Sequence, residues 1–285
     1  MPLATGLETT RRRISREWRT KRQRLRTTIA GGCIESVFQP IVDLRERRTF
    51  GLEALSRPLG GCAFSNAGEL FEAAEQLGML WPLERLTRAV TLGGLAGWPS
   101  GVRLFLNCSP SVIMDERFMS EILVALGATP ELSPADIVLE ITERCAGGLL
   151  PGLPERVQSL RARGFDIAID DVGAGASGLN QISSIRPNWL KLDRLLLADI
   201  DADPFRQSLV AAIVRFAHEN GIRVVAEGIE RAEELETVTD LGVGYAQGYL
   251  LGRPGPLAAG AVNGLKARNP WRNDWDPARR NGRAA

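Results

Sequence analysis

Short apolar runs alternate with longer amphipathic segments along most of the chain. The apolar runs predict strands at 37–42, 50–55, 102–107, 137–141, 166–170, 189–192, 222–226 and 245–248. Apolar residues at helical spacing predict helices over 69–80, 83–92, 115–126, 153–163, 204–220 and 232–241. Strands that alternate with helices form a parallel sheet covered by helices. So many strands in about 220 residues favour an α/β fold of the closed (β/α)8 barrel type over an open, doubly wound sheet.

The two ends of the chain differ from this central pattern. Residues 1–30 contain nine basic and two acidic residues and are interpreted as a basic N-terminal arm, either helical over about 15–29 or disordered. Residues 31–256 are expected to form the barrel domain, and residues 257–285 a C-terminal tail. The arm is interpreted either as a solvated extension or as a contact for an acidic partner, an anionic membrane surface or nucleic acid.

Composition narrows the possible classes of protein. With 285 residues, 44% of them hydrophobic, the chain can bury one large core. It lacks the run of about 18 apolar residues that a membrane span needs, and its arginine-rich start lacks an apolar signal segment. The four cysteines form no Cys-x-x-Cys pair, which favours a reduced, cytoplasmic setting.

Charge is distributed unevenly along the chain. The net charge is +1, while residues 1–30 carry +7 and residues 261–285 carry +4, so residues 31–260 carry −10. An acidic central region disfavours a nucleic-acid polymer as partner and suits a site that gathers divalent cations.

Polar side chains stand near the C-terminal end of the predicted strands. They are Glu53, Asn107, Glu140, Asp170, Asp171, Lys191, Glu227 and Gln247. In a barrel these ends converge on the face where barrel enzymes build their sites. Clustered carboxylates repel one another without cations, and oxygen ligands suit Mg²⁺ or Mn²⁺. Any one of these residues could equally be a strand-end cap or a surface charge, but the set as a whole indicates a metal site, in which the adjacent Asp170 and Asp171 could bridge two ions about 3.5–4 Å apart.

These residues lie in seven motifs that resemble, in order and spacing, those of EAL domains over residues 34–254. The motifs are Glu53-Ala54-Leu55-Ser56-Arg57, Leu106-Asn107-Cys108-Ser109, Leu139-Glu140-Ile141-Thr142-Glu143, Ile169-Asp170-Asp171, Leu190-Lys191-Leu192-Asp193, Val225-Ala226-Glu227-Gly228-Ile229-Glu230 and Gln247-Gly248-Tyr249-Leu250. The resemblance implies a TIM-like barrel with one antiparallel strand, forming a homodimer, that hydrolyses cyclic di-GMP (c-di-GMP) to linear pGpG. No sensory domain fits beside it, so an EAL domain standing alone is expected.

The resemblance also implies a role for each matching residue. One Mg²⁺ or Mn²⁺ is expected on Glu53, Asn107, Glu140 and Asp170, and a second on Asp170, Asp171 and Glu227. The catalytic residues would be Glu227 as general base, Lys191 on the attacking water and phosphate, and Glu53. The substrate would contact Gln39, Leu55, Arg57, Glu230 and Gln247. The loop after the paired aspartates would be anchored by Glu143.

One loop departs from the family pattern and leaves alternatives open. The usual Phe-Gly-Thr-Gly-Tyr-Ser-Ser is here Val172-Gly173-Ala174-Gly175-Ala176-Ser177-Gly178, without the rings or the threonine hydroxyl, and Pro58 replaces an aromatic residue. The chain is therefore interpreted as an active phosphodiesterase or as a catalytically weak or silent c-di-GMP receptor or interaction module. A Schiff-base lyase that uses Lys191 as nucleophile is a third hypothesis, which acidic surroundings oppose. A Ser-His-Asp mechanism is disfavoured because the lone histidine, His218, falls inside a predicted helix.

Overall fold

A closed eight-stranded barrel forms the centre of the protein. The computed structural model describes residues 3–142, 150–174 and 178–257, with side chains from Glu17 onward. The strands follow one another around the barrel in chain order. They are β1 (Ile34–Asp43), β2 (Arg48–Pro58), β3 (Arg103–Asn107), β4 (Ile137–Thr142), β5 (Asp166–Val172), β6 (Trp189–Leu192), β7 (Arg223–Ala226) and β8 (Tyr245–Ala246). Because β1 runs antiparallel to β2 and β8 while the other pairs are parallel, the predicted TIM-like barrel with one antiparallel strand is confirmed.

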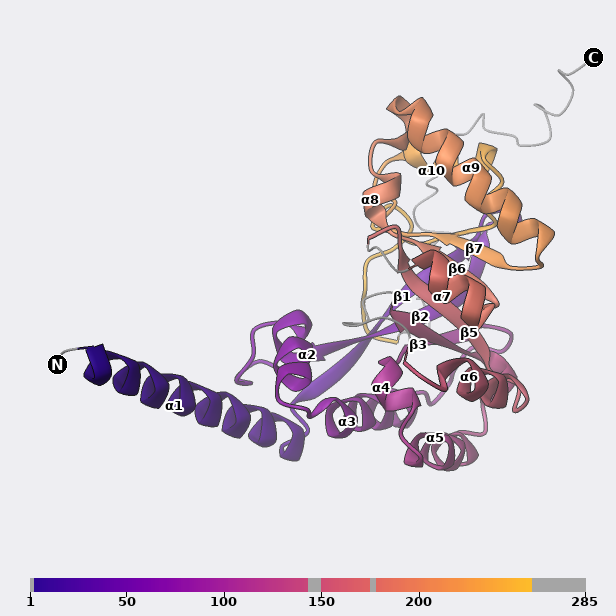
Figure 1. Ribbon diagram of the computed structural model, residues 1–285. Helices are drawn as coiled ribbons and strands as arrows, with labels where there is room; N and C mark the ends of the chain where they lie inside the picture. Colours follow the sequence, from indigo (N-terminus) through magenta and orange to yellow (C-terminus); the bar gives the residue numbers. More distant parts are fainter. Residues whose placement is uncertain (1–2, 143–149, 175–177, 258–285) are drawn as a thin grey trace, which may run out of the picture.

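Helices cover the outside of the barrel (Figure 1). They are α2 (Ala67–Gln76), α3 (Leu80–Gly93), α4 (Pro110–Ile113), α5 (Arg117–Gly127), α6 (Leu153–Arg161), α7 (Gly178–Ile185), α8 (Arg194–Leu197), α9 (Pro204–Glu219) and α10 (Ala232–Asp240), with 3₁₀ turns η1 (Pro134–Asp136) and η2 (Ile200–Ala202). The predicted helix 69–80 is wrong at its end, because Gly78 takes φ +64° and the chain turns before α3. Short helices such as α4 and α8 were not predicted, since four residues show no helical period.

The ends of α9 illustrate how local sequence sets these elements. The Asp203 carboxylate accepts the backbone N–H groups of Phe205 at 3.0 Å and Arg206 at 3.1 Å. Pro204 occupies the first turn, where no helical N–H bond is lost. The helix ends before Gly221, whose φ of +68° suits glycine.

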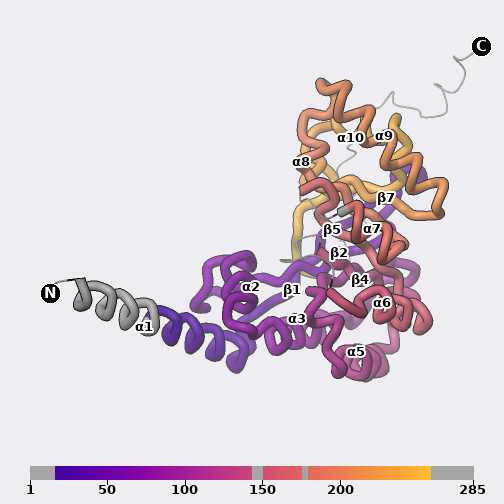
Figure 2. Tube along the Cα trace, in the orientation of Figure 1, coloured from indigo at the N-terminus to yellow at the C-terminus, as the bar shows by residue number. Residues whose placement is uncertain are grey.

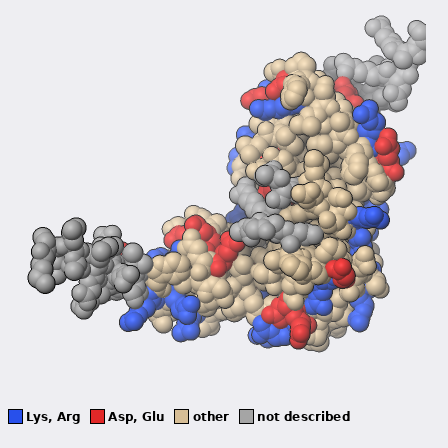
Figure 3. All heavy atoms as spheres, viewed as in Figure 1, with Lys and Arg blue, Asp and Glu red and all other residues tan. Residues whose placement is uncertain are grey.

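The N-terminal helix α1 (Leu3–Ala30) bears out the helical alternative for the arm and is longer than the predicted 15–29. Its last turns lie against α2 and α3 (Figures 1 and 2). Leu25 is fully buried there with Phe64 and Leu70, and Lys21 donates to Gln76 Oε1 at 2.7 Å. Basic side chains line the described part of α1, and acidic ones gather over α2 (Figure 3). No described helix combines the length and apolar character needed to cross a membrane.

Two apolar layers form the core of the barrel. Side chains on the outer face of the strands pack under the helices in one large cluster that includes Leu104, Leu139 and Ile169. The interior of the barrel is filled by Ile41, Phe105, Val138, Ala168, Trp189 and Val225. The Trp189 ring packs edge-on against Phe105, with 5.5 Å between ring centroids. The polar residues of the site lie directly above this interior layer, toward the C-terminal ends of the parallel strands.

Candidate active site

Polar side chains line the barrel at the C-terminal ends of its parallel strands. Alternate residues of a strand point the same way, so the residue two positions beyond each interior core residue also points inward. On the parallel strands, the residues two positions after the interior core residues are Asn107, Glu140, Asp170, Lys191 and Glu227. On the antiparallel strand β1, the equivalent residue lies two positions before Ile41 and is Gln39. Glu53 joins them because it lies beside Phe105 in the β2–β3 register and beside Gln39 in the β1–β2 register. Strand periodicity therefore gathers Glu53 and five of the other residues predicted from strand ends, whereas Asp171 and Gln247 are not placed by it.

A break in the regular pairing of β5 brings two neighbouring aspartates to the same place. In an ordinary strand Asp170 and Asp171 would point to opposite faces. The β5–β6 register shifts between Ile169 and Val172, and Asp171 takes φ +58°, a left-handed conformation that aspartate tolerates better than most residues. One oxygen each from Asp170, Asp171 and Glu227 consequently lies within 4.8 Å of the others.

Lys191 is the positive centre of the site. It is 1% exposed, although lysine is almost never fully buried unless paired. Its Nζ lies 2.7 Å from Glu140 Oε1, 2.8 Å from Glu227 Oε1, 3.0 Å from Asp170 Oδ1 and 3.5 Å from Glu53 Oε2. Four carboxylates thus share one ammonium group, which leaves an excess of negative charge.

Burial and mutual repulsion shift the ionisation of these groups. Burial, with the charge of Glu53 adding to it, raises the pKa of Glu140 well above its ordinary value. Burial likewise raises the pKa of Glu227 well above normal, against the attraction of Lys191. Burial alone would lower the pKa of Lys191, but the carboxylates around it, Asp170 first, raise that pKa well above normal. Lys191 is therefore an ammonium ion, which opposes the hypothesis of a neutral amine nucleophile in a Schiff-base lyase.

Glu53 belongs to a buried hydrogen-bond network that reaches β1 and the end of β8. Its Oε1 accepts from Asn107 Nδ2 at 2.9 Å, and its Oε2 accepts from Gln247 Nε2 at 2.7 Å. Gln247 Nε2 also lies 3.1 Å from Gln39 Oε1, and Gln39 in turn donates to the carbonyl of Gly252 at 3.1 Å. Burial alone would raise the pKa of Glu53, but Lys191 and the two amide donors lower it below its ordinary value.

The donor set suits divalent cations. Both carboxylate oxygens of Glu140 and Oδ1 of Asp170 are buried; Glu140 Oε1 and Asp170 Oδ1 contact the Lys191 ammonium, and within the described part of the chain Glu140 Oε2 has no hydrogen-bond partner. Buried carboxylate oxygens are costly unless a hydrogen bond or a cation satisfies them. Because Asn107 donates its amide N–H to Glu53, its carbonyl oxygen stays available as a neutral ligand. Carboxylate and carbonyl oxygens at such positions are the ligands that Mg²⁺ and Mn²⁺ take.

A pocket of about 520 Å³ opens beside this acidic centre. Its wall includes Leu55 and Arg57 from the end of β2, together with Asn107 and Asp171. The Arg57 guanidinium donates to the carbonyl of Ser56 at 2.9 Å. The structure thus brings two of the predicted substrate-contacting residues, Leu55 and Arg57, to one pocket that also touches Asn107 and Asp171 of the predicted metal ligands.

Two other predicted site residues are Glu230, which pairs with an arginine, and Glu143, which lies outside the described residues. The Glu230 carboxylate pairs with Arg194 of α8 through two N–H groups, one of them at 2.9 Å. Glu143, the predicted loop anchor, lies outside the described residues, as do residues 175–177 of the altered loop. Val172 is buried, and Ala174 N–H donates to the carbonyl of Asp171 at 3.0 Å.

The sequence reading missed a buried acid–base pair behind Asn107. Glu84 of α3 is 2% exposed, and both of its carboxylate oxygens accept the backbone N–H of Ser109, at 3.0 and 3.2 Å. Arg88 lies 3.4 Å from Glu84 Oε2. Burial raises the pKa of Glu84, partly offset by Ser109 and Arg88. The helical face formed by positions 80, 84, 87 and 91 reads Leu-Glu-Thr-Thr, so the sequence carries no apolar pattern that would mark Glu84 as buried.

The fold and the site together define a TIM-like α/β barrel with an acidic centre suited to divalent cations at the C-terminal ends of its strands. The family model of the EAL domain matches residues 22–254. The chain therefore belongs to the EAL domain family, as its motifs indicated.

The chain also resembles proteins of known name. It is 30% identical over 244 residues to the cyclic di-GMP phosphodiesterase NbdA and 30% identical over 232 residues to the cyclic di-GMP phosphodiesterase RocR, both from Pseudomonas aeruginosa. These matches cover 83% and 79% of this chain but only 31% of NbdA and 58% of RocR. A structure of Klebsiella pneumoniae BlrP1 with calcium and c-di-GMP superposes with a TM-score of 0.71 at 30% identity, covering 78% of this chain and 56% of BlrP1.

Proposed function

We propose that the protein hydrolyses c-di-GMP to linear pGpG with two bound Mg²⁺ or Mn²⁺ ions. The observation that carries the proposal is the grouping of Asp170, Asp171 and Glu227 oxygens within 4.8 Å, beside the Lys191 ammonium. The phosphodiesterase names of NbdA and RocR and the c-di-GMP in the BlrP1 structure support the choice of substrate.

The side chains that lie together suggest which residues would bind each metal ion. The residues that would hold one ion are Glu53, Asn107, Glu140 and Asp170, and those that would hold the other are Asp170, Asp171 and Glu227. When bound, such cations neutralise phosphate oxygens and lower the pKa of water toward neutrality.

The protein's own groups position and deprotonate the reactants. Glu227 takes a proton from a water molecule, whose oxygen attacks the phosphorus while the bond to the ribose 3′ oxygen breaks and that oxygen gains a proton. The buried ammonium of Lys191 stabilises the negative charge that builds on the phosphoryl oxygens. Arg57, on the pocket wall, can hold the second phosphate as a planar fork of donors.

A c-di-GMP receptor with little or no turnover is the second candidate. The change to Val172 and Ala174 favours it, because these residues directly follow Asp171 along the chain. Both candidates bind c-di-GMP, and product formation separates them.

Turnover should depend on the identity of the divalent cation. Protein freed of metal with a chelator is expected to produce pGpG with Mg²⁺ or Mn²⁺, and little with Ca²⁺, whose larger size and looser coordination suit binding more than catalysis. Chromatography of the reaction measures the product, and calorimetry with Ca²⁺ measures c-di-GMP binding. Binding without product at every concentration of Mg²⁺ and Mn²⁺ would favour the receptor instead.

We also propose that the protein dimerises through α9. This helix buries Val210, Val214 and Ala217 against the barrel, yet its outer face carries an exposed stripe of Phe205, Leu209, Ala212 and Phe216. Phe205 is 81% exposed. Large exposed apolar side chains grouped on one face mark an interaction site.

The α9 stripe is complementary to itself. In an antiparallel, two-fold pairing Phe205 falls opposite Phe216 of the second copy, and Leu209 falls opposite its Ala212, so large side chains meet small ones at the centre.

Charge on the α9 stripe should separate the subunits. Phe205→Glu is expected to convert a dimer into a monomer in sedimentation experiments, with little loss of stability because the ring is exposed. Val124→Glu, at a side chain of α5 that is 75% exposed, is the matched control and should leave the dimer intact. A dimer that survives Phe205→Glu, or a wild-type protein that is a monomer at tens of micromolar, would contradict this interface.

A further inference from the structure

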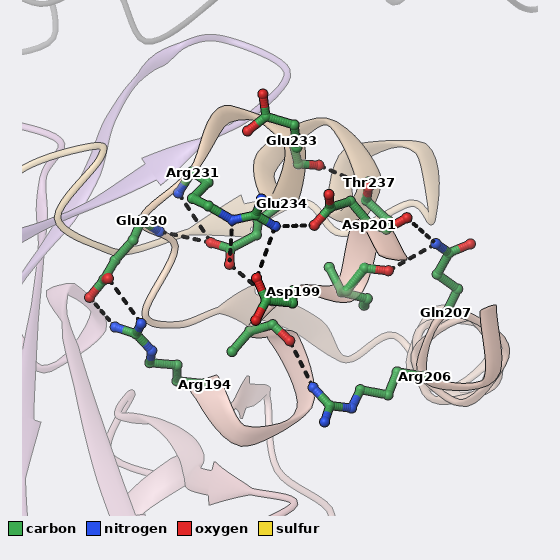
Figure 4. Close-up of polar contacts among 12 residues, drawn as sticks. Arg194, Asp199, Asp201, Arg206, Gln207, Glu230, Arg231, Glu233, Glu234 and Thr237 are labelled. Atoms are coloured by element: carbon green, nitrogen blue, oxygen red, sulfur yellow. Dashed lines mark hydrogen bonds and ion pairs between the residues drawn. The ribbon is translucent and has the colours of Figure 1, made fainter. Parts of the chain in front are cut away.

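The loop from β7 to α10 carries Glu227 and Glu230 and is held at its far end by a buried carboxylate, Glu234 (Figure 4). Glu234 is the third residue of α10 and is 4% exposed. Its Oε2 accepts the backbone N–H groups of Glu230 at 3.0 Å and Arg231 at 3.1 Å. One oxygen of Glu234 therefore accepts two backbone N–H groups of the loop, and these hydrogen bonds fix the path of the chain after Glu227.

The other oxygen of Glu234 holds a second loop, the one that follows α8. Its Oε1 accepts the backbone N–H of Asp199 at 3.1 Å, where Asp199 takes a left-handed φ of +57° (Figure 4). Arg231 Nη2 pairs with the Asp199 carboxylate at 3.3 Å and with that of Asp201. Burial alone would raise the pKa of Glu234, but the backbone donors of Glu230, Asp199 and Arg231 lower it below normal. An ionised Glu234 thus joins the loops that follow β6 and β7.

Arg194 of α8 contacts the β7–α10 loop near Glu227. Its guanidinium pairs with the Glu230 carboxylate through two N–H groups (Figure 4). Its side chain also lies directly against the loop backbone, because a Cβ placed on Gly228 would come within 2.7 Å of Arg194 Cβ. Gly228 takes φ +66° and is the immediate neighbour of Glu227.

The same short helix touches the segment that follows the paired aspartates at the end of β5. A Cβ placed on Gly173, at φ +103°, would collide with the Leu196 side chain of α8. The backbone N–H of Asp193, at the start of α8, donates to the carbonyl of Val172 at 3.1 Å. Helix α8 thus lies between the loop that carries Glu227 and the segment that follows Asp170 and Asp171 at the end of β5, and Glu234 holds the chain just beyond α8, at Asp199.

We propose that Glu234 is a positioning residue that sets the spacing between Glu227 and the Asp170–Asp171 pair, and thereby the affinity of these carboxylates for a divalent cation. Glu234 contacts none of the three directly and acts through the loop and α8. The inference rests on the proposed function in one respect, because it takes Glu227, Asp170 and Asp171 to be metal ligands. It also gives Glu230 a structural task, as the partner of Arg194.

Glu234→Gln tests the proposal through metal binding alone. The amide keeps the size of the side chain but cannot accept all three backbone N–H groups, so the loop and α8 lose their common anchor. Titration of Mn²⁺ into the protein, followed by electron paramagnetic resonance of the free ion, should show affinity for the weaker ion reduced by about 10–100-fold, the range for outer partners of metal ligands. Activity should return at a correspondingly higher Mn²⁺ concentration.

Glu233→Gln is the matched control, because it removes the same charge from the same first turn of α10. It should leave Mn²⁺ affinity unchanged. Equal Mn²⁺ affinity in Glu234→Gln and wild type, even with a lower melting temperature, would overturn the proposal in favour of a purely structural role.

A milder variant keeps the proposal testable if Glu234→Gln fails to fold. Arg194→Met removes the pair with Glu230 at a half-exposed side chain and should weaken Mn²⁺ binding in the same direction but less. Unchanged affinity in this variant would then overturn the proposal. Because Mn²⁺ binding is measured without c-di-GMP, a wild-type protein that binds Mn²⁺ but makes no pGpG would refute the proposed function alone.

Discussion

Glu53→Gln is expected to reduce c-di-GMP turnover by at least about 100-fold, because even removing an outer partner of a metal ligand has effects of that order. Glu53 is 6% exposed and lies where the Lys191 ammonium and the Asn107 and Gln247 amides converge. The substitution removes a charge that a cation needs and places an amide donor opposite two existing amide donors.

The variant should lose catalysis without losing its fold. Steady-state kinetics at saturating Mn²⁺ gives kcat, and a thermal melt reports the fold. Glu46→Gln is the matched control, since Glu46 is exposed in the turn between β1 and β2, at the other end of the barrel. Glu53→Gln activity within a few-fold of wild type would show that the ligand set has been assigned incorrectly.

Lys191→Met is expected to cause the largest loss of stability in the metal-free protein. It removes an ammonium group that lies within 3.5 Å of four buried or half-buried carboxylates. Removing one partner of a buried ion pair costs about 3–5 kcal/mol, because the remaining charge is left uncompensated. Divalent cations should restore much of this stability, since they supply the missing positive charge and bind only the folded state.

Denaturant unfolding with and without Mn²⁺ measures this effect. Mn²⁺ should raise the free energy of unfolding more in Lys191→Met than in wild type, while turnover stays lost because the lysine no longer stabilises the phosphoryl oxygens. Lys21→Met, at the exposed end of the contact with Gln76, is the control and should change neither quantity much. A variant as stable as wild type without metal would contradict the ionised state assigned to Lys191.

Much of the fold and of the clustering of acidic residues was predictable because barrel strands are short and buried on both faces. Runs such as 137–141 and 189–192 stand out as apolar segments, and the polar residue at the end of each falls on the inner face by simple alternation. Lys191 follows this rule, because it lies two residues beyond the interior Trp189.

Features set by backbone irregularity or by long-range packing were not predictable. Nothing in the sequence shows that Asp171 takes φ +58°, which turns it to the same side as Asp170. The roles of Glu84 and Glu234 depend on backbone N–H groups that are distant in the sequence. Glu84 accepts that of Ser109 and Glu234 accepts that of Asp199, and helical periodicity does not predict either contact. Glu230 was predicted as a substrate contact from its motif, whereas its pairing with Arg194 appears only in three dimensions.

The most direct test of the central claim, metal-dependent hydrolysis, is mass spectrometry of c-di-GMP incubated with the protein and Mn²⁺ in water enriched in ¹⁸O. Attack of water on phosphorus predicts pGpG with one ¹⁸O atom on its 5′-phosphate, formed only while Mn²⁺ is present and absent with Glu53→Gln. Recovery of unlabelled, intact c-di-GMP from a protein that binds both Mn²⁺ and the dinucleotide would contradict the account and leave a receptor.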